Sequence, residues 1–175
     1  MRFLLTTLLS TGFFLCVFAQ SSIDKTLQKF NKNTVAYISV NELKKDTIYA
    51  LFDTRKVEEF EVSHLENAYW VGHKKFEITK VLKKYPEKDT PIVVYCSIGV
   101  RSEDIGEKLL KAGYTNVKNL YGGIFEWSNM ENPVFDSHGN ETKKIHAFSK
   151  HWGKLLTNGE KIYTTKSKEL EKEIN

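Results

Sequence analysis

The sequence predicts an α/β fold in which an open parallel β-sheet is flanked by helices on both faces. Two apolar runs, residues 48–52 and 92–95, show continuous rather than alternating hydrophobicity, which is typical of strands covered on both faces. Segments with the helical spacing of apolar residues separate these runs from other short, strand-like stretches. Strands that alternate with helices along a chain indicate an open α/β sheet, so this is the expected architecture.

The predicted strands are short and rich in β-branched and aromatic residues, and they lie at 35–40, 48–52, 68–71, 92–95 and 117–120. The predicted helices lie between and after the strands, at 41–45, 57–60, 76–85, 102–112 and 124–130. The helix that follows residue 96 is expected to start with Ser102, whose hydroxyl suits a helix cap, and to end at Gly113. These elements place residues 34–135 in one domain.

Both ends of the chain are expected to lie outside this domain. Arg2 and the uncharged apolar stretch up to Ala19 are typical of a secretion signal, so residues 1–19 are predicted to be a signal peptide cleaved after Ala19. An uncleaved anchor is the alternative, although a membrane-spanning helix needs about 20 apolar residues. Residues 20–33 are predicted to be a mobile polar leader with one helical turn. Residues 136–175 are predicted to be an appendage that ends in a charged tail.

The charge distribution argues against a nucleic-acid partner. The formal net charge is +4, and the lysines are spread among glutamates instead of being clustered on one segment. After cleavage of the signal, the protein is expected to be periplasmic or secreted and not attached to a membrane. No metal site is predicted, because His138, His146 and His151 are scattered and lack companions at ligand spacing.

The cysteines are informative, because an exported protein normally pairs them. Of the two cysteines, Cys16 lies within the predicted signal peptide, so the mature chain would keep only Cys96. A lone thiol in such a chain is buried and inert, is reactive, or pairs with another molecule.

The residues around Cys96 favour a reactive thiol. Cys96 follows the buried run 92–95, and the carboxyl ends of parallel strands are where open α/β sheets bind ligands. The loop amides can curl into an anion-binding nest, which Gly99 makes easier, and the next helix adds its positive end. With the charge of Arg101, these groups would lower the thiol pKa below its usual value of about 8.5. The thiolate would then prevail at neutral pH.

At these residues the chain resembles the rhodanese family, whose active loop C-x-x-G-x-R-S stands here as residues 96–102. Asp53-Thr54-Arg55 with Glu59-Phe60 resembles the family's D-x-R…E-[FY] segment. Residues 121–127 are similar to its late G-G-x-x-x-W element. Residues 63–68 resemble its G-H-I-x-G-A segment, with Ser63 and Asn67 in place of glycines. The resemblance implies a rhodanese-like fold.

The resemblance also implies a sulfurtransferase that needs no cofactor. Cys96 would take a sulfur atom from a small anionic donor such as thiosulfate, hold it as a persulfide and pass it to a thiol or cyanide-like acceptor. Arg101 would orient the sulfonate of the donor and stabilise the departing sulfite. The substrate-binding loop would comprise Ser97, Ile98, Gly99, Val100 and Ser102.

Two other functions occur on this fold. Many rhodanese-like domains are non-catalytic binding or sulfur-carrier modules, although such domains often lack the cysteine. Cell-cycle phosphatases of the same architecture have seven residues from cysteine to arginine, whereas this chain has six. The shorter loop disfavours a phosphatase.

Supporting roles are expected for residues outside the loop. Asp53 and Arg55 are predicted to brace adjoining loops by ion pairing, with direct substrate contact as the alternative. His64 is expected to bond local backbone groups. In the appendage, residues 143–156 show helical spacing and are predicted to form a helix across the domain surface, or a docking face for a protein partner.

Overall fold

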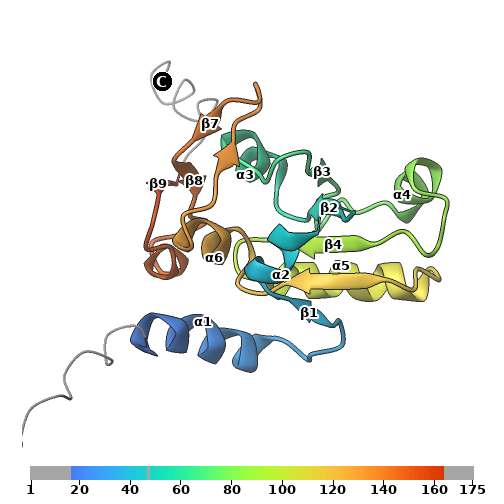
Figure 1. Cartoon of the computed structure of the whole chain (residues 1–175), viewed down its shortest axis with the longest axis horizontal. Coiled ribbons are helices and arrows are strands. Elements are labelled where there is room, and N and C mark those ends of the chain that lie inside the picture. The colour runs from blue at the N-terminus through green and yellow to red at the C-terminus, as the bar shows by residue number, and fades with distance from the viewer. Residues whose placement is uncertain (1–16, 47, 164–175) are drawn as a thin grey trace, which may run out of the picture.

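The computed structural model of the chain describes residues 17–46 and 48–163. Its centre is a five-stranded sheet in which every pair of neighbouring strands is parallel (Figure 1). The strands are β1 (Tyr37–Ile38), β2 (Ala50–Asp53), β3 (Tyr69–Trp70), β4 (Ile92–Tyr95) and β5 (Val117–Leu120). They lie in the order β1-β5-β4-β2-β3, which places β4 in the middle of the sheet.

Helices cover both faces of the sheet, as the sequence predicts. They are α1 (Val17–Phe30), α2 (Val40–Lys45), α3 (Val57–Val62), α4 (Ile78–Lys84), α5 (Val100–Lys111) and α6 (Gly123–Asn129). Val93 and Tyr95 of β4 pack in one hydrophobic core with apolar residues of α2 and α6. Ile92 and Val94 pack in a second core with apolar residues of α4 and α5. The continuous hydrophobicity of β4 therefore reflects burial on both sides.

Most predicted elements are present, but four helix starts differ from prediction by one or two residues, and two of these differences have a clear local cause. Ser39 ends β1 early, because it forms a capping box that starts α2. In this box the hydroxyl of Ser39 accepts a hydrogen bond from the amide of Glu42, and the carboxylate of Glu42 accepts one from the amide of Ser39. The prediction that Ser102 caps the helix after Cys96 is wrong. Gly99 is the N-cap of α5, with a φ of 108°, and Ser102 lies inside the helix.

The prediction of a mobile leader at 20–33 is also wrong. Those residues belong largely to α1, which is 14 residues long, and its Ile23 and Leu27 are buried on one side of the helix. The predicted signal peptide lies mostly outside the described residues, so export stays a prediction. No helix in the described ranges is long and apolar enough to span a bilayer.

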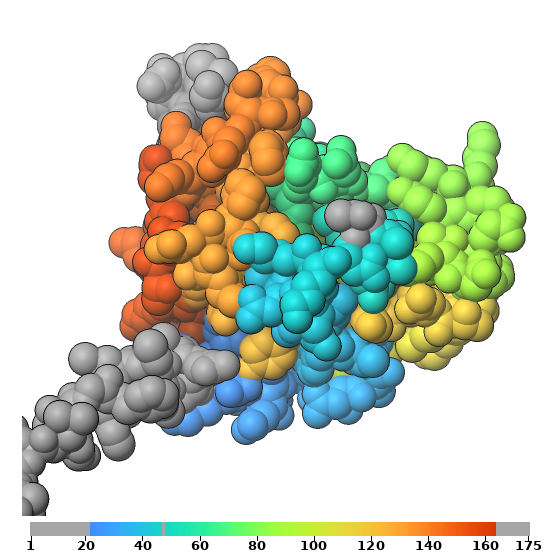
Figure 2. Space-filling model, viewed as in Figure 1, coloured from blue at the N-terminus to red at the C-terminus, as the bar shows by residue number. Residues whose placement is uncertain are grey.

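The predicted helix at 143–156 is replaced by short strands and one turn of 3-10 helix. The elements of this region are β6 (Val134–Phe135), β7 (Glu141–Thr142), β8 (Lys144–His146), η1 (Trp152–Leu155) and β9 (Glu160–Ile162). Ile145 and Ala147 are buried with the period of a strand, and Phe148 then takes a φ of 61°, which no α-helix accommodates. This C-terminal segment, orange to red in Figure 2, forms one flank of the molecule. The predicted charged tail lies outside the described residues.

Candidate active site

Cys96 lies directly after β4, at the carboxyl end of the parallel sheet. The first two carbonyl groups of its loop accept hydrogen bonds from the start of α6: Ile124 N donates to Cys96 O and Phe125 N donates to Ser97 O, both at 3.0 Å. Because the C=O and N–H of a trans peptide point in opposite directions, these bonds turn the following amides away from α6. The amide of Gly99 then donates to the Cys96 Sγ at 3.1 Å. The loop thus has the curled geometry that the sequence predicts.

Two glycines and two asparagines hold the loop in this shape. The carbonyl of Gly99 accepts from Asn119 Nδ2 at 2.8 Å and from Asn31 Nδ2, just after α1, at 3.0 Å. Asn119 in turn accepts from the hydroxyl of Ser102 at 2.8 Å, which gives Ser102 a structural role. At Gly123, where φ is 55°, a Cβ would lie 2.3 Å from the carbonyl oxygen of Cys96. Only glycine permits α6 to approach the loop so closely.

A buried carboxylate holds Arg101 beside the loop. The guanidinium donates to Glu59 through Nη1 at 2.7 Å and through Nη2 at 2.8 Å, and Nη2 also donates to Ser97 Oγ at 3.0 Å. Glu59 is 1% exposed. Burial alone would raise its pKa, but the hydrogen bond and charge of Arg101 lower the pKa of Glu59 to about 2. Glu59 is therefore ionised at neutral pH and forms a fork-to-fork ion pair with Arg101.

These groups also act on the thiol. Burial of Cys96 disfavours the thiolate, whereas the charge of Arg101 and hydrogen bonds from the amides of Ile98 and Gly99 favour it. The favourable contributions are larger, so the pKa of Cys96 is lowered. The sulfur is buried but is surrounded by donors and a cation, as a nucleophilic cysteine requires.

Asp53 and Arg55 form the ion pair that the sequence predicts. Both side chains are fully buried, Arg55 Nη2 lies 2.6 Å from Asp53 Oδ2, and the same nitrogen donates to the carbonyl of Ser63 at 2.6 Å. The pair ties the end of β2 to the loop after α3. Neither side chain lines the pocket described below. His64 Nδ1 pairs with the carbonyl of Phe60 at 3.0 Å, so His64 bonds local backbone as expected.

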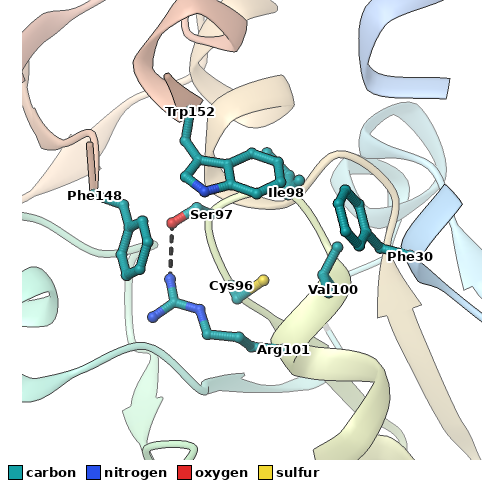
Figure 3. A pocket seen from close by; sticks show the side chains of 8 residues that line it. All are labelled: Phe30, Cys96, Ser97, Ile98, Val100, Arg101, Phe148 and Trp152. Atoms are coloured by element: carbon teal, nitrogen blue, oxygen red, sulfur yellow. Dashed lines mark hydrogen bonds between the residues drawn. The ribbon is translucent and has the colours of Figure 1, made fainter. Parts of the chain in front are cut away.

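A pocket of about 190 Å³ opens onto Cys96. Five predicted loop residues line it together with three aromatic residues that were not predicted as site residues: Cys96, Ser97, Ile98, Val100 and Arg101 with Phe30, Phe148 and Trp152 (Figure 3). Phe30 comes from α1, whereas Phe148 and Trp152 come from the C-terminal segment. Within the described ranges, no group of three His, Cys, Asp or Glu side chains is placed to hold a metal ion.

Sequence reasoning missed four residues of this site: Phe30, Glu59, Phe148 and Trp152. Glu59 belongs to the segment that resembles the rhodanese family, so its acidic side chain was a usable signal. The three aromatic residues gave no local signal, because only the packing of the two ends of the chain brings them to the loop.

The model of the rhodanese-like domain matches residues 38–130, more than half of the chain. An adenylyltransferase and sulfurtransferase of Candida albicans is 34% identical over 114 residues, which are 62% of this chain and 26% of that protein. This chain thus spans about a quarter of that relative. The thiosulfate sulfurtransferase GlpE of Coxiella burnetii is 28% identical over 109 residues, which are 61% of this chain and 95% of GlpE.

Among solved structures, a thiosulfate sulfurtransferase of Pseudomonas aeruginosa has the same fold. The TM-score is 0.54 at 18% identity, over 79% of this chain and 26% of that chain. The region that the family model matches contains the Cys96 loop and all of the parallel sheet except Tyr37 of β1. The chain therefore belongs to the rhodanese-like domain family.

Proposed function

We propose that the protein is a sulfurtransferase that carries sulfane sulfur on Cys96, from a donor such as thiosulfate to a thiophilic acceptor. One observation carries the proposal: Cys96 Sγ accepts a hydrogen bond from the amide of Gly99 at 3.1 Å, lies beside the charge of Arg101 and faces a pocket. A lowered thiol pKa supplies the nucleophile. The sulfurtransferase names of two relatives support the same chemistry.

The reaction consists of two displacements. The Cys96 thiolate attacks the outer sulfur of thiosulfate, a new S–S bond forms at Sγ, and the S–S bond of the donor breaks with its electron pair leaving on sulfite. Cyanide or a thiolate then attacks the outer sulfur of the Cys96 persulfide. The electron pair of that breaking bond returns to Cys96, and no net oxidant is consumed.

The amides of the loop and Arg101 act on the charge that moves between these sulfur atoms. They are in place before the reaction, so stabilising a thiolate or persulfide anion requires no reorganisation. Glu59 holds the guanidinium in position and opposes part of its charge. Arg101 therefore acts on Sγ from a fixed orientation.

The test compares the wild type with Cys96→Ser. Thiosulfate treatment should add one sulfur atom to the wild type, as read by intact mass, and subsequent cyanide should remove it as thiocyanate. Cys96→Ser should show neither event. Equal thiocyanate production by both proteins would refute the proposal, and a stable persulfide that no nucleophile discharges would indicate a sulfur carrier.

A further inference from the structure

The wall of the pocket over Cys96 is apolar on nearly every side. Two aliphatic side chains of the loop and three aromatic rings line it: Ile98, Val100, Phe30, Phe148 and Trp152. Figure 3 shows the rings arranged around the loop, with the Cys96 sulfur lying in the space between them. The volume of about 190 Å³ suits a small organic group rather than a large cofactor.

The aromatic part of this wall lies outside the region that the family model matches. Phe30 precedes that region, and Phe148 and Trp152 follow it. The rings of Phe30 and Trp152 meet edge to face at 5.7 Å, so the two ends of the chain close one side of the pocket together. Phe30 is 50% exposed and Phe148 is 43% exposed, which core packing does not explain.

The charges near the pocket do not favour a charged sulfur acceptor over an apolar one. Arg101 is the cation that lines it, and the buried carboxylate of Glu59 is paired with it through two hydrogen bonds. Lys29 and Lys56 lie over the rings of Phe30 and Phe148, at 5.3 and 5.8 Å from the ring centres. Both lysines are exposed, so water and salt screen their charges.

We propose that the sulfur acceptor of this site is a thiol with an uncharged apolar substituent, such as an aryl or branched alkyl group, and that Phe30 and Phe148 select this acceptor. The inference rests on the proposed function. In the transfer step, the thiolate R–S⁻ attacks the outer sulfur of the Cys96 persulfide, an R–S–S bond forms and the Cys96 S–S bond breaks. Its electron pair returns to Cys96 as the thiolate, and the product is the persulfide of R–SH.

The test measures transfer from preloaded Cys96 to two thiols that differ in charge, phenylmethanethiol and 2-mercaptoethanesulfonate. The full chain is loaded with inorganic polysulfide, freed of excess reagent and mixed with each thiol, and the loss of one sulfur atom is followed by intact mass. The uncatalysed reaction of each thiol with a small persulfide corrects for its intrinsic reactivity. The wild type should prefer phenylmethanethiol by about tenfold or more after this correction, equivalent to about 1.4 kcal/mol.

Three variants assign the preference to the aromatic wall. Phe30→Ala and Phe148→Ala should each lower the rate constant for phenylmethanethiol about threefold or more, with a smaller change for the sulfonate thiol. Phe30→Lys should lower the first rate constant and raise the second, a change that unfolding cannot produce. Leu110→Ala is the matched control, since Leu110 is an exposed apolar residue of α5 about 15 Å along the helix from Val100.

The outcomes separate the two proposals. If polysulfide adds no sulfur to Cys96, the proposed function and this inference both fail. If the persulfide forms but discharges equally to both thiols, or if Phe30→Lys leaves the ratio unchanged, the sulfurtransferase stands and the apolar thiol is refuted.

Discussion

Glu59→Gln removes the negative charge that holds Arg101 in the active site while keeping the size of the side chain. In the folded protein, the pKa of Glu59 is lowered from 4.5 to about 2, because the hydrogen bonds and charge of Arg101 outweigh the effect of burial. Each pKa unit corresponds to about 1.4 kcal/mol, so the ionised carboxylate contributes about 3 kcal/mol to the free energy of unfolding. Removal of one partner of a buried ion pair lowers the free energy of unfolding by a similar amount, about 3 to 5 kcal/mol.

The pH dependence has a defined direction. A carboxylate whose pKa is lowered by folding stabilises the folded state fully above its unfolded pKa, and this contribution declines as pH falls from about 4.5 towards 2. The variant lacks this contribution at every pH. The wild type should therefore be about 3 kcal/mol more stable than Glu59→Gln at pH 7, and the difference should shrink at pH 3.

The assay is urea unfolding followed by tryptophan fluorescence at pH 7, 5 and 3, with the same dependence of unfolding free energy on urea concentration fitted to both proteins. Glu61→Gln is the matched control, because Glu61 is exposed on the same helix, and it should change stability by no more than about 0.5 kcal/mol. A loss below about 1 kcal/mol for Glu59→Gln at pH 7 would refute the reasoning. So would a difference between wild type and variant that stays constant from pH 7 to pH 3.

Two further predictions concern the loop. Arg101→Ala should raise the pKa of Cys96, because the nearest positive charge is removed, and Arg101→Lys should raise this pKa less. The pH dependence of alkylation by iodoacetamide measures both pKa values, and an unchanged midpoint would contradict the electrostatic role of Arg101. Gly123→Ala should destabilise the protein by about 3 kcal/mol and slow sulfur transfer, because its Cβ would clash with the carbonyl of Cys96. At Gly139, φ is 77° and an added Cβ would meet no atom within 4 Å, so Gly139→Ala should lower the free energy of unfolding by only about 1 kcal/mol. Thermal unfolding measures both variants, and equal losses for Gly123→Ala and Gly139→Ala would count against the clash.

The parts of the fold that the sequence predicts well depend on local pattern. The runs at 92–95 and 117–120 coincide with β4 and β5, because a short β-prone apolar segment between turn residues has few alternatives to a buried strand. The start of α5 was misplaced by two residues, since the left-handed conformation of Gly99 is a property of the closed loop. The prediction of a helix at 143–156 was wrong, because the burial of Ile145 and Ala147 in an extended segment overrides the weak helical spacing of the apolar residues.

The sequence by itself placed a thiol at the end of β4 with a glycine and an arginine close after it, since Cys96, Gly99 and Arg101 lie within six consecutive residues. Only the tertiary structure decided what surrounds that sulfur. Glu59 reaches Arg101 from α3, and Phe30, Phe148 and Trp152 arrive from opposite ends of the chain. Such contacts depend on how separate elements pack against one another, and no local pattern of residues records that packing.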